Sequence, residues 1–181
     1  NALAAVAACA SLGVQPGIMA AALSAMTAVP GRLEEIKTGS GFQVFVDYAH
    51  TDDALDNVLR TLREITKGRL IVVFGCGGNR DRTKRPLMGK VAAALADHSI
   101  LTSDNPRNED PAGIIAEIRG GVGPASSVEI IEDRAAAIGK AVEIAGEGDV
   151  VLIAGKGHEN FQEFANRSIP FDDRQVVKRY L

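Results

Sequence analysis

The sequence predicts an α/β domain in which helices cover both faces of a mostly parallel sheet. From residue 42 onward, apolar segments of strand length alternate with segments whose apolar residues recur at helical spacing. "RLIVVFG" (69–75) is almost wholly apolar, as expected of a strand buried on both faces. Polar, glycine-rich loops follow the strands, whereas the helix-to-strand turns carry few such residues. Ligands bind beyond the carboxyl ends of the strands in such sheets, so these loops form the candidate site.

The first part of the chain predicts two short helices. Residues 2–12 and 17–28 are rich in Ala, and "GVQPG" separates them. "VPGR" ends the second helix, and "KTGSG" has the composition of a hinge or turn. We therefore place a domain boundary near residue 37, which divides the chain into residues 1–36 and 37–181.

After this boundary, strands and helices alternate to the end of the chain. The predicted strands are 42–48, 69–75, 98–102, 128–131 and 149–153, and the predicted helices are 51–66, 86–96, 111–119 and 133–145. Asp52 and Asp53 begin the first of these helices, where carboxylates stabilise the positive end of the helix dipole. The tail "FQEFANRSIPFDDRQVVKRYL" predicts a short hairpin and a closing helix.

Composition excludes several classes of protein. The 20 basic and 23 acidic residues are mixed along a chain of net charge −3, so there is no basic footprint for nucleic acid. Cys9 and Cys76 are too few for a disulfide framework or a zinc site, and a reducing, cytoplasmic setting fits best. No run reaches the roughly 18 apolar residues of a membrane span. "NALAAVAACASLGV" lacks the basic start of a signal peptide, so we expect a buried helix there.

The loop "GCGGNRDRTKRP" follows the buried strand. Gly75, Gly77 and Gly78 allow a ligand to approach the backbone closely, although a purely structural tight turn is equally consistent. The spacing matches neither the dinucleotide fingerprint nor the phosphate loop GxxxxGK[ST]. Four basic residues could face a carboxylate or a phosphate: Arg80, Arg82, Lys84 and Arg85. Of these, we interpret Arg82 and Lys84 as solvated.

The segment "SDNPRNEDP" suits a ligand that carries both charges. Asp104 can accept hydrogen bonds from an ammonium, Asn105 can donate and accept, and Arg107 can hold a carboxylate by two parallel bonds. Pro106 stiffens the backbone that carries them. An amino acid has an ammonium and a carboxylate side by side and fits this pattern. The alternative is that Asp104 and Arg107 neutralise each other while the loop caps helix 111–119.

Two further strand ends carry candidate residues. "AGKGHE" places Glu159 where it could pair with an ammonium, beside His158, a residue type that is usually structural or solvated in a loop. "VDYAH" offers Asp47 and His50, and an Asp at this place commonly accepts from a ribose hydroxyl. No Ser-His-Asp, Cys-His or metal-ligand spacing is recognisable. The pattern indicates holding and orienting of charged ligands, and we assign no catalytic residue and no metal ligand.

Taken together and in order, "VPGRLE", "DYAHTDDAL", "GGNRDRTKRPLMG", "SDNPRNEDP" and "GKGHE" resemble the Mur ligases of bacterial cell-wall synthesis, in particular members that add meso-diaminopimelate. The resemblance covers essentially the whole chain. It implies a Rossmann-like C-terminal domain, preceded by two helices from the end of a truncated central ATPase domain. It also implies ATP and Mg²⁺ as cofactors, meso-diaminopimelate and UDP-N-acetylmuramoyl-L-alanyl-D-glutamate as substrates, and a cytoplasmic, monomeric enzyme.

The resemblance also implies roles for matching positions. The implied meso-diaminopimelate site consists of Arg80, Asp104, Asn105, Pro106, Arg107, Gly155 and Glu159. Arg80 and Arg107 then hold carboxylates, and Glu159 meets the ammonium at the non-reacting end. Lysine-adding relatives carry a different sequence in place of DNPR. The implied ATP-contacting positions are Asn1, Arg32, Asp47 and His50. The chain departs from the family at Asp52, where Pro is usual, and at Asn79, where Asp is usual.

These residues lack the parts that the family uses for its chemistry, namely a phosphate loop, a magnesium-binding acid and a uridine-nucleotide domain. In the family, ATP phosphorylates a carboxylate and the diaminopimelate amine attacks the acyl phosphate. We therefore expect this chain alone to be inactive. Three alternatives stay open: another acceptor such as lysine, a non-catalytic nucleotide-binding α/β module, and an interaction domain. For the last of these we see no exposed apolar helix face.

Overall fold

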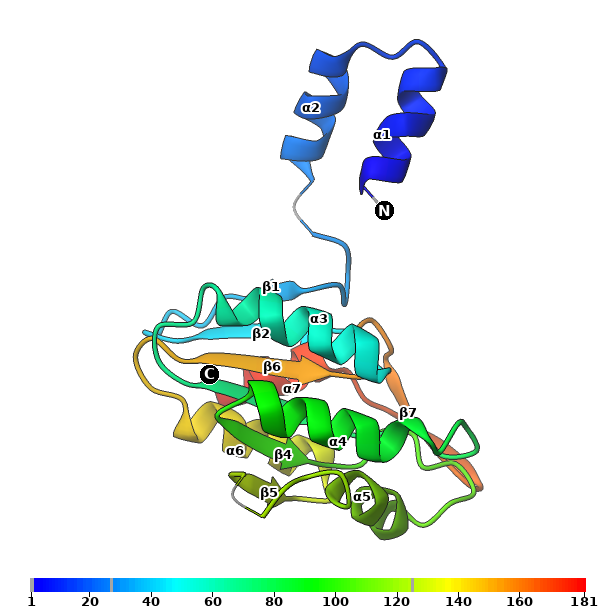
Figure 1. Ribbon diagram of the computed structural model, residues 1–181, viewed down its shortest axis with the longest axis vertical. Coiled ribbons are helices and arrows are strands. Elements are labelled where there is room, and N and C mark those ends of the chain that lie inside the picture. The colour runs from blue at the N-terminus through cyan, green and yellow to red at the C-terminus, as the bar shows by residue number, and fades with distance from the viewer. Residues whose placement is uncertain (1, 27, 125) are drawn as a thin grey trace.

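The structure is a computed structural model that describes residues 2–26, 28–124 and 126–181. Its main body is a six-stranded sheet between two layers of helices (Figure 1). The strands of this sheet are β1 (Glu34–Ile36), β2 (Gln43–Asp47), β3 (Leu70–Phe74), β4 (His98–Leu101), β5 (Val128–Ile130) and β6 (Val150–Ala154). Five of them lie where the sequence predicts a strand, and β1 is a strand that the sequence pattern did not indicate.

The strand order is β1-β2-β6-β3-β4-β5, with β1 antiparallel to β2 and all other neighbours parallel. The predicted α/β class with a mostly parallel sheet is therefore confirmed. The central strands β3 ("LIVVF") and β6 ("VVLIA") are buried along their whole length, because helices cover both faces. The last long strand in the sequence, β6, lies between β2 and β3, so the loops after all three strands become neighbours.

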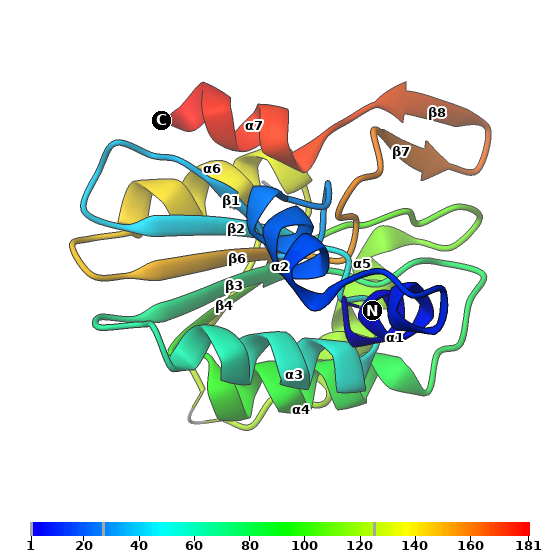
Figure 2. The same ribbon diagram turned by 90° about the horizontal axis from the view of Figure 1, so that it is seen from above.

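Five helices cover the sheet: α3 (Asp52–Arg63), α4 (Lys84–Leu95), α5 (Pro111–Arg119), α6 (Arg134–Ile144) and α7 (Asp173–Tyr180). Helices α3, α4 and α5 lie on one face, and α6 and α7 lie on the other (Figure 2). The right-handed rule for parallel crossovers explains this division. The connections from β2 to β5 advance across the sheet in one direction, whereas the connection from β5 to β6 returns in the other. Helix α6 therefore lies on the opposite face from α3, α4 and α5.

Each covering layer has its own apolar core. On one face, Leu59 of α3 and Met88 of α4 pack in the cluster that contains Phe74 of β3. On the other face, Ile138 of α6 and Val177 of α7 pack in a second cluster. All five side chains are fully buried. The alternation of the strand side chains between the two clusters is what gives this sheet its nearly continuous apolar sequence.

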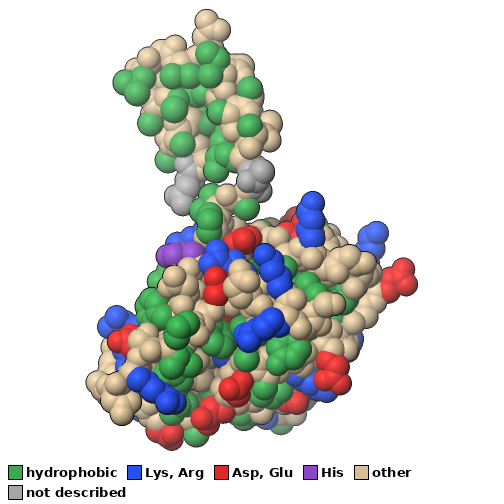
Figure 3. Space-filling model, turned by 180° about the vertical axis from the view of Figure 1, so that it is seen from behind, with side chains coloured by type: hydrophobic (Ala, Val, Ile, Leu, Met, Phe, Trp, Pro, Cys, Tyr) green, Lys and Arg blue, Asp and Glu red, His purple; other side chains and the backbone are tan. Residues whose placement is uncertain are grey.

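Two further helices, α1 (Ala2–Ser11) and α2 (Pro16–Ala25), contact each other and stand away from the sheet (Figure 1). Neither buries a residue, and Leu3 and Leu12 are 85% and 83% exposed. Figure 3 shows apolar side chains over the outer surface of this pair. The expected buried helix, and the statement that no apolar helix face is exposed, are therefore wrong for the described residues. A helix buries its apolar side chains only where a second surface covers them.

The C-terminal part confirms the predicted hairpin and closing helix. Strands β7 (Phe161–Phe164) and β8 (Arg167–Pro170) form a separate antiparallel pair, and α7 follows them. At the other end, β1 belongs to the main sheet although it precedes residue 37. The division into residues 1–36 and 37–181 remains a prediction. Among the described residues, no helix is both long enough and apolar enough to cross a membrane.

Candidate amino-acid-binding site

The loops that follow β2, β3, β4 and β6 surround a cavity of about 410 Å³ at the carboxyl edge of the sheet. It is lined by six of the residues that the sequence analysis assigned to the amino-acid site: Arg80, Asp104, Asn105, Arg107, Gly155 and Glu159. His50 lines the same cavity. The insertion of β6 between β2 and β3 brings these loops together, because parallel strands end at the same edge. Asp81 and Lys84 also line it, so the cavity contains two guanidinium groups, one ammonium, three carboxylates and an amide.

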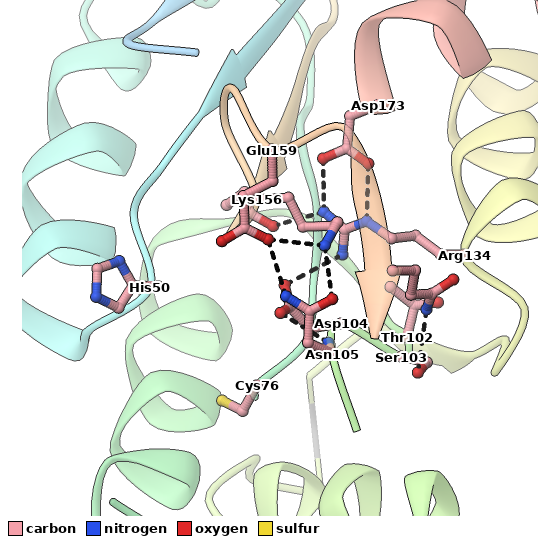
Figure 4. A network of polar contacts seen from close by, with 12 residues as sticks. His50, Cys76, Thr102, Ser103, Asp104, Asn105, Arg134, Lys156, Glu159 and Asp173 are labelled. Atoms are coloured by element: carbon pink, nitrogen blue, oxygen red, sulfur yellow. Dashed lines mark hydrogen bonds and ion pairs between the residues drawn. The ribbon is translucent and has the colours of Figure 1, made fainter. Parts of the chain in front are cut away.

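Asn105 and Glu159 line this cavity and form a hydrogen-bonded triangle with Lys156, whose side chain is fully buried (Figure 4). Asn105 donates from Nδ2 to Glu159 Oε2 over 2.8 Å, and Lys156 Nζ donates to the same oxygen and to Asn105 Oδ1, both over 2.9 Å. The backbone N–H of Glu163 also donates to Asn105 Oδ1. Burial acts to raise the pKa of Glu159, but the bonds from Lys156 and Asn105 outweigh burial and hold the pKa below its usual value. Glu159 therefore presents a carboxylate to the cavity.

Arg107 is held in place by its own backbone and by the β7–β8 hairpin. Its φ of 51° is a conformation that non-glycine residues rarely adopt, and its N–H donates to Glu163 O. Its guanidinium donates to Gly78 O over 2.9 Å and pairs with the Glu163 carboxylate at 2.9 Å. Arg107 thus pairs with Glu163, not with Asp104, and Asp110 caps α5 by accepting from Gly113 N. The alternative in which Asp104 and Arg107 neutralise each other is therefore wrong.

Arg80 is the more exposed of the two cavity guanidinium groups. Its Nη1 makes only a long contact of 3.4 Å with Asn79 O, and within the described residues it belongs to no ion pair. Asn79, the departure from the family pattern, has a φ of 52° and accepts from Asn108 N through Oδ1 over 3.0 Å. Its amide oxygen thus ties the glycine loop to the loop after β4. Arg80 keeps its donors available for an anionic ligand.

Arg85 stabilises the glycine loop, because its Nη2 donates to Gly77 O over 3.3 Å. Its fully buried guanidinium also binds both Glu109 and Glu117 at 2.9 Å, and the hydrogen bonds that Glu109 accepts from Arg85 and from Asn79 N lower the pKa of Glu109 to about 2. Arg82 pairs with Glu117 and stays exposed, as the sequence analysis proposed. Lys84 is also partly exposed, but it lines the cavity and donates to His50 O, a position that its interpretation as a solvated residue did not include. A linear charge run does not reveal which side chains a loop turns inward.

The glycines of the loop are explained mainly by close packing against the loop after β4. A Cβ at Gly75 would lie 2.1 Å from Thr102 O, and one at Gly78 would lie 1.9 Å from Pro106 O. These contacts account for Gly75 and Gly78 as parts of a tight turn, and only Gly77 lines the cavity. Pro106 is buried and lies behind the cavity, where its carbonyl meets Gly78. Its contribution is therefore to the shape of the loop.

Gly155 and Asp104 meet at the floor of the cavity. Gly155 has a φ of 111°, and a Cβ there would lie 2.8 Å from Asp104 Oδ2. Asp104 Oδ1 accepts from Asn105 N, while Oδ2 has no hydrogen-bond partner within the described residues. The nearest cation is Arg134, whose Nη1 lies 3.9 Å away. One carboxylate oxygen of this cavity-lining residue is thus buried without a hydrogen-bond partner among the described residues.

Arg134 and Asp173 were not selected by the sequence analysis, and they support this floor from behind. Both side chains are fully buried and form two bonds of 2.8 Å, and Arg134 also donates to Ala154 O. Burial acts to lower the pKa of Arg134, and Asp173 outweighs this effect, so the pKa is raised and the guanidinium stays charged. The only indication in the sequence was a basic residue at the start of a predicted helix. Such a residue is normally exposed, so it did not suggest a buried ion pair.

The residues assigned to ATP lie near the cavity or outside the described chain. Asp47 accepts from Leu33 N and Ala49 N, both over 2.7 Å, so its carboxylate joins the end of β2 to the segment before β1. The Arg32 guanidinium lies 4.7 Å from the centre of the Tyr48 ring, beside the cavity. His50 lines the cavity, and its Nδ1 lies 2.9 Å from Tyr48 O. Asn1 lies outside the described residues. The ATP-contacting role of these positions remains a prediction.

Cys76, which follows β3, is not a candidate nucleophile. Cys76 is buried beside Met88, and burial raises the pKa of its thiol to about 12, so it is not a thiolate at neutral pH. Across the residues that the structure describes, no three His, Cys, Asp or Glu side chains are grouped so as to hold a metal ion. The arrangement can bind and orient charged groups by hydrogen bonds and ion pairs.

These features define a class of protein: an α/β domain with a charged cavity between its strand-end loops. The family model "Mur ligase, glutamate ligase domain" matches residues 31–157. The chain belongs to the Mur ligase family.

Two curated relatives and two solved structures illustrate the similarity. The UDP-N-acetylmuramoyl-L-alanyl-D-glutamate--2,6-diaminopimelate ligase of Syntrophomonas wolfei subsp. wolfei is 52% identical over 183 residues, which cover 100% of this chain and 37% of the relative. The ligase of that name from Aquifex aeolicus is 53% identical over 169 residues, or 93% and 35% of the two chains. A solved structure with that name has a TM-score of 0.80 at 42% identity, covering 98% of this chain and 37% of its own.

The second solved structure, UDP-N-acetylmuramate-alanine ligase of Thermotoga maritima, shares the fold at 21% identity, with a TM-score of 0.66 and coverage of 99% and 35%. The chain spans 37% of the first relative, little more than a third of its length. The family match begins at residue 31, after α1 and α2.

Glu163 offers a test of how Arg107 is used. We expect that Glu163→Gln in the intact enzyme lowers the KM for a dicarboxylate amino acid about two- to fivefold. Glutamine keeps a hydrogen-bond acceptor for Arg107 but removes a half-exposed negative charge, an effect of up to about 1 kcal/mol that salt screens. KM measured at two ionic strengths checks this, with Glu143→Gln on α6 as the matched control. A raised KM would show instead that the Glu163 carboxylate binds the ligand.

Proposed function

We propose that this chain is the C-terminal part of an ATP-dependent amide ligase that adds meso-diaminopimelate to UDP-N-acetylmuramoyl-L-alanyl-D-glutamate in peptidoglycan precursor synthesis. The observation that carries the proposal is the convergence of Arg80, Arg107 and Glu159 on one cavity. The printed names of relatives at 52% and 53% identity support the choice of substrates.

The cavity suits the non-reacting end of a diamino diacid. In our proposal, Arg107 and Arg80 bind its carboxylates, and Glu159 with Asp104 accepts from the ammonium. The backbone N–H of Arg107 donates to Glu163 O, and its guanidinium contacts Gly78 O and the Glu163 carboxylate, so the guanidinium is held in place before the ligand arrives. Pre-organised donors lower the entropic cost of binding, and they favour a ligand that carries a matching carboxylate over one that lacks it.

The contribution of these residues to catalysis is orientation. Holding the far end of the acceptor amino acid places its reacting amine relative to the activated carboxylate, which lowers the entropic part of the barrier. We propose ATP and Mg²⁺ as cofactors that activate the carboxylate of the UDP-linked substrate, held mainly by residues upstream of this chain. Arg32, Asp47 and His50 then form one wall of the nucleotide cleft. This chain alone is accordingly proposed to be inactive, cytoplasmic as part of the enzyme, and monomeric.

Comparison of two acceptor amino acids tests the proposal. ADP release by the intact enzyme, with ATP and the UDP-linked dipeptide present, is measured with meso-diaminopimelate and with L-lysine. We expect kcat/KM to favour meso-diaminopimelate by about 100-fold or more, because lysine lacks the carboxylate that pairs with the fixed guanidinium groups. Equal use of both amino acids, or a preference for lysine, would contradict the proposed acceptor while leaving the ligase family intact.

A further inference from the structure

Lys156 is a buried cation that neither the sequence analysis nor the proposed binding contacts include. It follows β6, its side chain is fully buried, and it does not line the cavity. Lysine is almost never fully buried without a partner. Its partners here are Asn105 and Glu159, two residues that do line the cavity, and its ammonium also lies 5.6 Å from the centre of the Phe161 ring. Lys156 is therefore linked to the cavity through its hydrogen bonds to these two neighbours.

We infer that Lys156 is a positioning residue of the amino-acid site, which holds Asn105 and Glu159 in the orientation that the ligand's ammonium requires without touching the ligand itself. The inference rests on the function proposed above. It adds a residue that acts through the binding groups.

The hydrogen-bond geometry shows how one lysine can set two side chains. Asn105 Oδ1 receives Lys156 Nζ and Glu163 N, which leaves Nδ2 as the amide's donor toward Glu159. Glu159 Oε2 receives both Lys156 and Asn105, so the two donors converge on a single carboxylate oxygen. The other oxygen has no bonded protein partner among the described residues and is left for the ligand. Without Lys156, the Glu159 carboxylate keeps a single hydrogen bond among the described residues, from Asn105, and Asn105 Oδ1 keeps a single donor, Glu163 N, so both side chains are held less firmly.

The charge of Lys156 also decides the protonation state of Glu159. The charged groups that face Glu159 are Lys156 on its own loop, Arg107 and Asp104 on the loop after β4, and Arg134 on α6. Burial favours the protonated acid, and Lys156 is the largest of the opposing influences on the pKa of Glu159. Removing Lys156 leaves burial less opposed, so the pKa of Glu159 rises. The carboxylate, and with it ammonium binding, is then lost at a higher pH than in the wild type.

Lys156→Met in the intact enzyme tests this inference. We expect the KM for meso-diaminopimelate to rise about 10- to 100-fold, as for the loss of hydrogen bonds to a charged group. kcat should stay within about threefold, because Arg80 and Arg107 still hold the carboxylates of the bound ligand and so keep its reacting amine oriented. The acid limb of the kcat/KM profile should move to higher pH. Lys140→Met, which removes an exposed lysine from α6, is the matched control and should change neither quantity.

Replacing both charges, K156M together with E159Q, separates positioning from a general structural role. If Lys156 acts through Glu159, the double variant has the KM of E159Q alone. The double variant also covers the case in which K156M does not fold, because it leaves no unpaired buried carboxylate. Additive effects on KM, or an unmoved acid limb, overturn the inference. A wild-type enzyme that does not use meso-diaminopimelate overturns the proposed function instead, so the two failures are distinguishable.

Discussion

Replacing Arg107 by Ala in the intact enzyme should abolish its discrimination between meso-diaminopimelate and lysine. The guanidinium lines the cavity from a fixed backbone, and we propose that it binds the distal carboxylate. Truncating one partner of such a charge pair costs about 2–5 kcal/mol, so kcat/KM for meso-diaminopimelate should fall by about 30-fold to several thousand-fold. kcat/KM for lysine should stay constant, because lysine has no distal carboxylate and loses no ion pair when the guanidinium is removed.

Competition assays in which both amino acids are present measure this ratio directly. Arg60→Ala is a suitable control, because Arg60 is an exposed arginine of α3 that pairs with Asp56 four residues earlier and, among the described residues, is not part of the cavity lining. It should leave the ratio unchanged, as exposed helix pairs contribute little. A wild-type ratio in Arg107→Ala would mean that Arg80 alone recognises the distal carboxylate.

Asp173→Ala should produce the largest loss of stability. It removes both carboxylate bonds from the fully buried Arg134 and leaves Ala154 O as the remaining hydrogen-bond acceptor among the described residues. Breaking one partner of a buried ion pair costs about 3–5 kcal/mol, and Asp104, whose Oδ2 lies 3.9 Å from Arg134 Nη1 without a hydrogen bond, compensates the remaining charge only in part. At about 2–4 °C per kcal/mol for a chain of this size, the midpoint of thermal unfolding should fall by about 6–20 °C.

Two further variants test whether the loss of stability in Asp173→Ala comes from the charge that remains on Arg134. Lys140→Ala removes an exposed ion pair of α6 and should shift the midpoint by less than about 2 °C. The double replacement Arg134→Met with Asp173→Leu removes both buried charges and should recover most of the lost stability. Calorimetry of the chain gives all three midpoints. A double variant no more stable than Asp173→Ala would show that packing, not the charge that remains on Arg134, determines the loss.

Several elements of the fold and site could be predicted from neighbouring residues. The uninterrupted apolar runs of β3 and β6 follow from burial on both faces, and the helical spacing of residues 52–63 follows from burial on one. Six of the seven residues assigned to the amino-acid site line one cavity, because each follows a strand and parallel strands end together. The exceptions are informative: Pro106 lies behind the cavity, and β1, a three-residue edge strand, is too short to show a period.

What the sequence alone determined is therefore local: the class of the fold, the positions of the strands and helices, and the chemical types at the strand ends. Only the tertiary structure decided that β6 lies between β2 and β3, that Arg107 pairs with Glu163, and that Lys156 is buried against Glu159. The physical reason is range. Periodicity is set by which face of one segment is buried, whereas strand order and ion pairing depend on segments dozens of residues apart. The sequence does not show whether a lysine or arginine side chain is surrounded by water or paired with a carboxylate. Only the packing of the folded chain determines this.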